Sequence, residues 1–113
     1  MIGYAIDVDT RELKKVLKRL LKTEKKESLV FLSYVPGKLT ISLGHTSEEL
    51  SVGGGPWPSL VSADARWVTA LAENPFNVSS TDLRVHDGKL WARDFNVHCT
   101  IIDGVEEVKR APT

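Results

Sequence analysis

The hydrophobic positions near the start of the chain predict a strand followed by an amphipathic helix. Tyr4–Val8 is short and apolar enough for a strand, and residues 11–22 then change to a helical period. Apolar side chains recur there at the i, i+3, i+4, i+7, i+8 spacing of one helix face: Leu13, Val16, Leu17, Leu20 and Leu21. Asp9 or Thr10 is expected to cap the helix, because a short side-chain oxygen accepts a free first-turn N–H.

The segments that follow alternate with the two-residue period of strands. Leu29–Val35 and Lys38–Leu43 flank Pro36-Gly37, a dipeptide typical of turns, and together they predict a hairpin. Glu48–Val52 is expected to add a third strand. The run Gly53-Gly54-Gly55-Pro56-Trp57-Pro58 interrupts all regular structure and is interpreted as a connector.

After the connector the same order of elements begins again. Ser59–Val61 is predicted as a short strand and Ser62 as the N-cap of a helix over residues 63–73. Asn74-Pro75 ends this helix, since proline cannot continue it. The side chains expected on its inner face are Trp67, Ala70 and Leu71.

Three more strands are predicted beyond this helix. Phe76–Ser80 is the first, and Leu83–His86 and Lys89–Arg93 flank Asp87-Gly88, a strong signal for a tight hairpin. Phe95–Ile102 is the last strand, and the remaining residues are expected to form a tail.

The predicted order is therefore strand, helix and three strands, written twice. Gly37-Lys38-Leu39 reappears as Gly88-Lys89-Leu90 at an offset of 51 residues, and Val8 matches Val61 at an offset of 53. We interpret this order as an internal duplication within one domain. Its parts are a unit 2–52, a connector 53–58, a second unit 59–103 and a tail 104–113. Two such units predict an α+β fold with two helices packed on one face of antiparallel sheet.

Composition places the chain among small globular proteins. Its 113 residues suffice for one domain, and its single cysteine, Cys99, excludes an internal disulfide framework and fits a reducing compartment. The N-terminus carries no basic segment followed by a long apolar run, and no stretch approaches the ~20 apolar residues of a membrane span. We expect a cytoplasmic protein with no membrane partner.

The charge is balanced over the whole chain but concentrated in the first helix. Fifteen Lys and Arg residues balance fifteen Asp and Glu residues, yet residues 11–26 hold eight of the basic ones. Opposite the apolar stripe lie Arg11, Lys14, Lys15, Lys18 and Lys22, with Arg19 at the edge of this face. Such a face is compatible with plain solvation or with an anionic partner. A membrane-surface helix is disfavoured, because the same apolar stripe has to cover the sheet.

The duplicated pattern resembles one domain of a DNA sliding clamp, the family of the bacterial beta clamp and the eukaryotic proliferating cell nuclear antigen. The resemblance covers residues 2–103, and its most specific part is Leu60–Val68, where clamp domains begin their second helix after a short strand. The hairpin Leu83–Leu90, followed by Phe95–Ile102, is similar to the strands that close such a domain. In that family the helices line a central hole and present basic residues to duplex DNA.

When residues are matched by position, the resemblance implies phosphate contacts from the first helix and from Arg66, the only basic residue of the second helix. The implied DNA-contacting residues are Arg11, Lys14, Lys15, Lys18, Lys22 and Arg66. Lysine contacts to phosphate carry no base information, so this binding is expected to be independent of sequence and sensitive to salt. Clamps close a ring of six domains, so a ring of this chain requires copies joined edge strand to edge strand.

No catalytic, metal or cofactor site is predicted. Gly53-Gly54-Gly55 lacks the Lys-Ser/Thr and the helix start of a phosphate-binding loop. His98 and Cys99 are adjacent in a strand and point to opposite faces, so they cannot share a metal. Asp7 and Asp9 are interpreted as a solvated residue and a cap. Trp57, between two prolines, is the one tryptophan expected to be exposed as a contact residue.

Two functional hypotheses follow, with a third that has no residues to support it. The first is a non-enzymatic sliding-clamp-like protein that binds duplex DNA through its basic helix as a self-assembled ring with replication partners. The second is a protein–protein interaction module of the same fold that acts through its sheet edges without encircling DNA. A small enzyme would need converging titratable groups, and none are evident.

Overall fold

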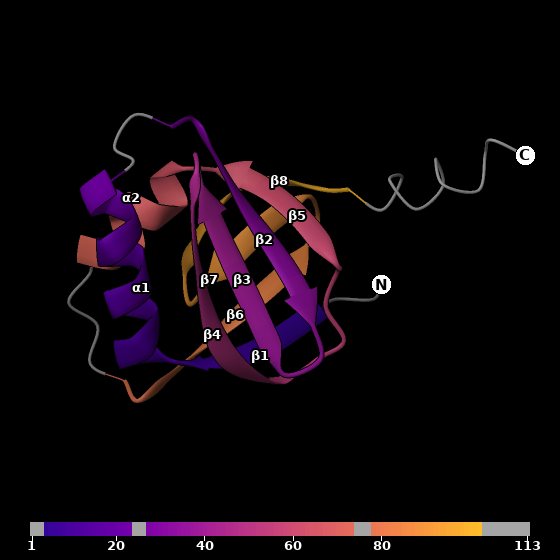
Figure 1. Ribbon diagram of the computed structural model, residues 1–113. Coiled ribbons are helices and arrows are strands. Elements are labelled where there is room, and N and C mark those ends of the chain that lie inside the picture. The colour runs from indigo at the N-terminus through magenta and orange to yellow at the C-terminus, as the bar shows by residue number, and fades with distance from the viewer. Residues whose placement is uncertain (1–3, 24–26, 74–77, 103–113) are drawn as a thin grey trace, which may run out of the picture.

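The computed structural model describes residues 4–23, 27–73 and 78–102, which form eight strands and two helices (Figure 1). In chain order these are β1 (Tyr4–Asp9), α1 (Thr10–Thr23), β2 (Leu29–Val35), β3 (Lys38–Leu43), β4 (Thr46–Gly54), β5 (Leu60–Asp64), α2 (Arg66–Glu73), β6 (Ser80–His86), β7 (Lys89–Ala92) and β8 (Phe95–Ile101). Within these residues the order strand, helix, three strands occurs twice.

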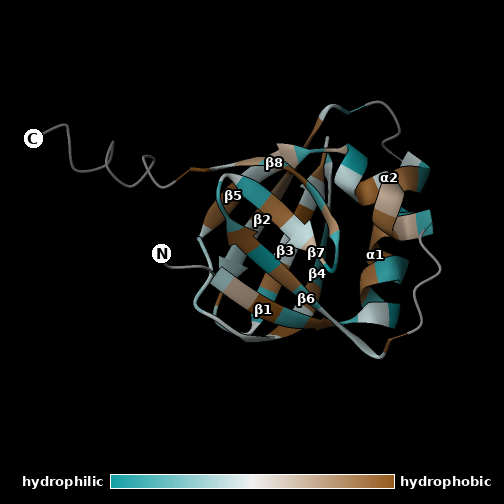
Figure 2. Ribbon diagram, turned by 180° about the vertical axis from the view of Figure 1, so that it is seen from behind, coloured by the Kyte–Doolittle hydropathy of each residue, from teal (hydrophilic) through white to brown (hydrophobic). Residues whose placement is uncertain are grey.

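The strands close into a barrel rather than forming an open sheet. Its circular order is β1-β4-β3-β2-β5-β8-β7-β6, with every pairing antiparallel. The expectation of one sheet face covered by two helices is corrected in this respect. Both helices lie side by side on one side of the barrel (Figures 1 and 2). Closure depends on the short β1–β4 and β5–β8 ladders.

The first strand of each half pairs with the other half of the chain. β1 runs along β6 from Tyr4↔Val85 to Asp9↔Ser80, and β5 runs along β2 from Leu29↔Asp64 to Ser33↔Leu60. Shorter ladders complete the barrel, with β1 meeting the end of β4 and β5 meeting the end of β8. The barrel thus consists of two four-strand groups, β5-β2-β3-β4 and β1-β6-β7-β8, and each group contains one strand from the opposite half.

Hydrogen bonds at the ends of the elements occur in matching positions in the two halves. The Thr10 amide donates to the Ser79 carbonyl, and the Ala65 amide donates to the Ser28 carbonyl, both at 3.0 Å. Each hairpin turn also accepts a bond from the strand that follows: Val52 to Gly37 at 3.1 Å and Cys99 to Gly88 at 2.9 Å. Each helix therefore begins beside the strand that opens a hairpin in the other half of the chain.

The core fills the barrel and the space beneath the helices. In β2, β3 and β6 buried side chains alternate with more exposed ones, as half-buried strands require. From α1 the core takes Thr10, Leu13, Val16, Leu17 and Leu20, and from α2 it takes Trp67, Val68, Leu71 and Ala72. Leu21 and Ala70, expected on the inner faces, are only half-buried.

The predicted connector is more ordered than expected, because a tryptophan anchors it. β4 extends through Gly54, and Trp57 is 5% exposed, so its assignment as an exposed contact residue is wrong. The Trp57 Nε1 donates to the Leu83 carbonyl at 3.1 Å, and its ring lies 6.2 Å from that of Tyr34. A buried indole with a satisfied N–H contributes more as a core residue than as a surface contact.

The second helix begins later than predicted. β5 runs to Asp64, so Ser62 lies in a strand and is not an N-cap, and α2 starts at Arg66. The strand predicted at 83–86 is longer than expected, because β6 begins at Ser80. Of the strand predicted at 76–80, only Ser80 lies in β6; residues 78 and 79 precede it, and 76 and 77 lie outside the described residues. Asp87 and Gly88 have φ of 55° and 72°, the left-handed pair that a tight hairpin turn requires. The predicted tail, 104–113, also lies outside the described residues.

Candidate nucleic-acid interface

Helix α1 is positioned by its N-cap and its apolar stripe. The Asp9 Oδ1 accepts a hydrogen bond from the Glu12 amide at 2.9 Å. Of the two residues proposed as the cap, Asp9 is therefore the one that caps the helix. Thr10 is instead buried, and its hydroxyl is bonded to that of Thr81 at 2.7 Å. Leu13 and Leu17 are fully buried, which fixes the rotation of the helix about its axis. The polar side of α1 must therefore face outward.

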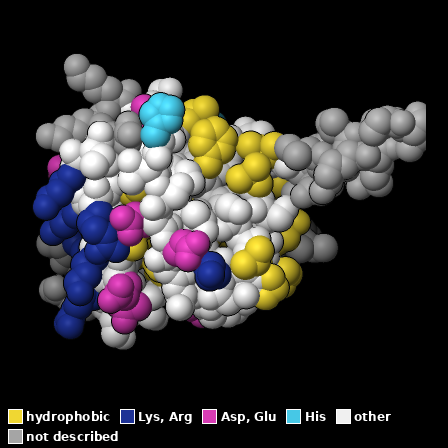
Figure 3. All heavy atoms as spheres, in the orientation of Figure 1, with side chains coloured by type: hydrophobic (Ala, Val, Ile, Leu, Met, Phe, Trp, Pro, Cys, Tyr) yellow, Lys and Arg dark blue, Asp and Glu magenta, His cyan; other side chains and the backbone are white. Residues whose placement is uncertain are grey.

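The basic residues on that polar side form an exposed surface, which we call the α1 basic face: Arg11, Lys15, Lys18 and Lys22. Figure 3 shows dark blue side chains gathered along one margin of the molecule, at the position of α1. Lys14 is half-buried and has an interaction partner within the chain, so it is less available than its position in the sequence suggested. Cations 3 and 4 residues apart on one helix repel one another in the absence of an anion.

Arg19, at the edge of this face, is engaged with the barrel. Its Nε and Nη2 donate to the Glu48 Oε1 of β4 at 3.1 and 2.9 Å. The hydrogen bond to Glu48 raises the pKa of Arg19 above its ordinary value. Near it, the hydroxyls of Thr23 and Thr46 are bonded at 3.1 Å. These contacts fasten α1 to the outer edge of β4 and remove one cation from the surface available to a partner.

Arg66 is placed on the helix side of the molecule, but its charge is locally balanced. Its amide donates to the Asp64 Oδ1 at 2.9 Å, and its guanidinium Nε and Nη2 lie 3.0 and 2.9 Å from Oδ2. The hydrogen bond from the Arg66 side chain lowers the pKa of Asp64, and the same bond raises that of Arg66. Asp64 thus caps α2 and pairs with its first residue, a role that the sequence analysis missed.

The pair of helices consequently presents one basic and one nearly neutral surface. On α2 the exposed side chains after Arg66 are Thr69 and Glu73. A shallow hollow of about 330 Å³ lies between the C-terminal ends of the two helices, lined by Lys18, Leu21, Lys22, Ala72 and Glu73. The electrostatic attraction for a polyanion is concentrated along α1.

The two groups of strands leave one edge each beside a helix. β4 pairs with β3 from Thr46 to Ser51 and with β1 only near its end, so no described strand covers the outer edge of Thr46–Ser51. β8 repeats this arrangement, pairing with β7 over Phe95–His98 and with β5 from Cys99. The open edges predicted for assembly are thus only part of a strand, Thr46–Ser51 in β4 and Phe95–His98 in β8, because barrel closure covers the rest.

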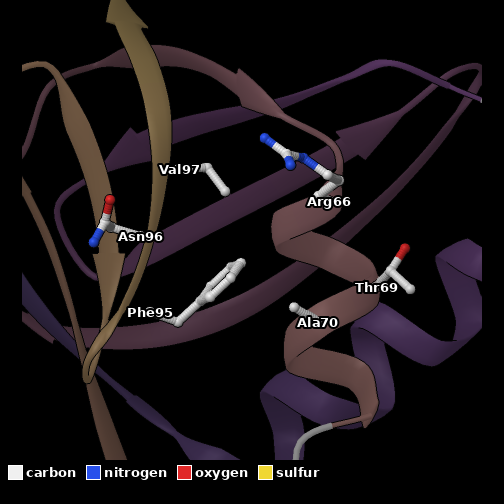
Figure 4. Close-up of a pocket in the computed structure, with 6 residues that line it drawn as sticks. All are labelled: Arg66, Thr69, Ala70, Phe95, Asn96 and Val97. Atoms are coloured by element: carbon white, nitrogen blue, oxygen red, sulfur yellow. The ribbon is translucent and has the colours of Figure 1, made fainter.

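A cavity lies beside the β8 edge. Arg66, Thr69 and Ala70 of α2 and Phe95, Asn96 and Val97 of β8 line a hollow of about 340 Å³. Figure 4 shows Phe95 and Val97 extending from β8 toward Ala70, with Arg66 at one end of the hollow. We call this the α2–β8 hollow. Apolar side chains beside unpaired backbone groups suit the addition of an extended segment.

Other predicted features place little chemistry near the helices. Among the described residues, no group of three or more His, Cys, Asp or Glu side chains could hold a metal ion. His86 stacks on Trp91 with ring centroids 5.1 Å apart, and burial raises the pKa of the Cys99 thiol. Within the same part of the chain, neither helix has the length and apolar character of a membrane span.

Comparison with known proteins identifies the fold. No protein-family model and no curated protein sequence matches this chain. Among solved structures it is similar to the Helicobacter pylori beta clamp solved with carprofen, at 14% identity and a TM-score of 0.71 over 90% of this chain. A Pseudomonas aeruginosa DnaN sliding clamp bound to griselimycin gives 18% identity and 0.70 over 88%. The C. crescentus beta sliding clamp gives 18% and 0.65 over 84%.

These likenesses confirm that the chain has the fold of one domain of a bacterial beta sliding clamp. It covers only 30%, 31% and 29% of the three solved chains, about a third of each. At this level of identity the likeness concerns the fold, and the action of the chain has to be argued from its own surface.

Proposed function

We propose that this chain is a non-enzymatic clamp-like domain that binds duplex DNA, without sequence preference, through the α1 basic face. The observation that carries the proposal is the phase of α1: its apolar side is fixed in the core, so Arg11, Lys15, Lys18 and Lys22 must face outward together. The fold that it shares with beta clamps supports the same assignment.

The proposed mechanism is electrostatic. Phosphates of duplex DNA are spaced closely enough for consecutive cations of one helix to contact several of them, and binding releases the counterions that the phosphates held. Such contacts position the protein but do not read bases, so the domain can move along the duplex. Arg66, whose charge is balanced by Asp64, is proposed as a weaker contact than the lysines of α1.

Assembly completes the proposal. We propose that copies join head to tail, the exposed edge of β4 in one copy pairing with that of β8 in the next, until a ring closes. The matching element order and hydrogen bonds of the two halves support their origin as two copies of one β-α-β-β-β unit. In a ring each repeat would contribute one helix to the inner surface, and α1 would supply most of its positive charge.

DNA binding is tested with a matched pair of double variants. Lys15→Glu with Lys18→Glu reverses two charges on α1, and Lys38→Glu with Lys89→Glu reverses two on strands. We expect the first to weaken binding to a long duplex at low salt by about tenfold or more and to reduce the salt slope by ~2, since each lost phosphate contact removes ~0.9. The second should change affinity by less than about twofold, since surface charges away from the contact act only at long range. Equal effects of the two variants would rule out α1 as the DNA surface.

The alternative is a protein–protein interaction module of clamp-like fold, and the α2–β8 hollow is the feature that favours it. An extended partner segment could pair with Phe95–His98 and place a side chain beside Phe95 and Val97. Light scattering separates assembly from this alternative: a strict monomer, with and without DNA, together with no DNA affinity at low salt, would support the interaction module.

A further inference from the structure

The outward side of β2 is the most apolar exposed surface among the described strands. Its outward residues are Leu29, Phe31, Ser33 and Val35, which we call the β2 stripe. Leu29 is 47% exposed, Phe31 39% and Val35 55%, and only Ile101 joins them among the exposed large hydrophobic side chains of the described residues. Figure 3 shows the hydrophobic side chains gathered on the part of the surface away from the basic margin.

The surroundings of the stripe are nearly uncharged. Beside the middle of β2 the neighbours are uncharged: Phe31 lies between Ser42 and Ser62, and Ser33 lies between Thr40 and Leu60. Charged side chains stand near the two ends, and each has an internal partner. Lys38 is 3.5 Å from Glu49, and Asp64 is 2.9 Å from Arg66. Interface centres are depleted in charge in the same way.

The backbone of β2 restricts how a partner can bind there. β2 pairs with β3 on one side and with β5 on the other, so its amides and carbonyls are already engaged. An extended segment therefore cannot add to it as a strand. The occupant has to present a surface of side chains whose own backbone is satisfied, such as the face of another sheet.

The side chains of the β2 stripe are complementary in size to the same stripe of a second copy that runs in the opposite direction. A twofold axis between Phe31 and Ser33 would place Phe31 of one copy over Ser33 of the other, and Leu29 over Val35, so that a large side chain meets a small one. The balanced charge pairs add no repulsion between identical faces, whereas the α1 basic face would repel its own copy. We propose that the β2 stripe is a self-association surface on which a second copy of this chain packs face to face.

The expected contact is small. Six residue steps of strand and the width of three strands, β5, β2 and β3, give a footprint of about 300 Å² per copy, well under half of the ~800 Å² per partner of a standard interface. The association is therefore weak and reversible. It rests on apolar burial, so salt does not weaken it, in contrast to contacts of the basic helix. It is independent of the DNA-binding proposal and of the β4 and β8 edges.

Sedimentation equilibrium over about 5 µM to 1 mM, the range of weak complexes, tests this proposal. Phe31→Lys is expected to raise the dimer dissociation constant at least about tenfold, because it places a charge at the centre of the contact. Ile101→Lys is the matched control, with another exposed apolar residue replaced outside the stripe, and should leave the constant within about twofold. Phe31→Ser, checked for folding by circular dichroism, gives the same readout without a new charge.

Amide chemical shifts followed through a dilution series locate the contact. Concentration-dependent shifts confined to β2, β5 and β3, unchanged by added salt, are the expected result. Shifts at Thr46–Ser51 or Phe95–His98 instead would assign self-association to the strand edges and overturn the proposal. A chain that remains monomeric throughout the series would overturn it too, leaving the stripe to a different protein.

Discussion

Helices α1 and α2 occupy matching positions beside the barrel, yet they present different surfaces. α1 has 14 residues and an exposed row of cations, and the ion pair between Arg19 and Glu48 joins it to β4. α2 has 8 residues, one arginine whose charge is balanced, and a hollow where it faces β8. The longer helix contacts β4 through side chains, and the shorter one leaves a hollow beside β8. One architecture thus provides a charged surface in one half and an apolar recess in the other.

The contrast extends to how each helix is held. α1 contributes several medium-sized side chains to the core, and the largest contribution of α2 is Trp67, which is fully buried beside Val68 and Leu71. A helix of two turns has little stability of its own, so its position depends on tertiary packing. The inner faces are alike in burial even where the outer faces differ.

The largest expected effect tests whether the short helix matters as much to stability as the long one. Trp67→Ala should destabilise the fold by about 3–5 kcal/mol. This loss is at least as large as the ~2–5 kcal/mol expected for Leu17→Ala. Both values follow from urea unfolding monitored by circular dichroism. Trp67→Phe should cost much less, because the Trp67 Nε1 has no hydrogen-bond partner within the described residues and the ring volume is largely kept. A Trp67→Ala loss below about 1 kcal/mol would contradict the importance of α2.

A smaller effect tests the difference in charge between the helices. Lys15→Ala should lower the slope of log affinity against log salt for duplex DNA by ~0.9, the value for one phosphate contact. Arg66→Ala should change the slope by much less, because Asp64 already balances its guanidinium. Fluorescence anisotropy across a salt series measures both slopes. Equal slopes for the two variants would show that the helices contribute alike.

The smallest effect concerns the start of α2. Asp64 has a pKa below its ordinary value because it accepts a hydrogen bond from Arg66, so its ionised form stabilises the folded state. That contribution is complete above the unfolded pKa, near 3.8, and is lost as pH falls through the lower folded pKa. Asp64→Asn should therefore lower the melting temperature at pH 7 and have a diminishing effect toward pH 2, as measured by thermal scans. A difference independent of pH would assign the effect to geometry alone.

The elements with strong periodicity were predictable from the sequence, because local forces determine them. The stripe of α1 and the Asp87-Gly88 turn both appear where the pattern placed them. Closure of the barrel was not predictable, because it depends on short ladders such as Val61↔Ile101 that join distant segments. Trp57 was assigned to the surface because its proline neighbours suggested an irregular exposed loop, whereas the Leu83 carbonyl gives its indole a buried partner.

The candidate site was predictable only in part, for related reasons. The outward row of cations follows from helical phase, but the partners that occupy some of them come from other strands. Glu48 reaches Arg19 from β4, and nothing in the spacing of the two residues indicates the contact. Asp64 before Arg66 was a readable cap signal, but the predicted start at residue 63 obscured it. The α2–β8 hollow needs three-dimensional placement of Phe95 beside Ala70.

The exchange of β1 and β5 between the halves has a consequence for how the chain reaches its native state. The Thr10–Thr81 bond joins residues 71 positions apart, and the β1–β6 ladder beside it spans a comparable distance. Neither half can satisfy its backbone alone, because a fragment ending at the connector would lack β6 beside β1 and β5 beside β2. We expect a single cooperative transition and slow acquisition of structure, since such distant pairings must close a long loop before they gain contacts.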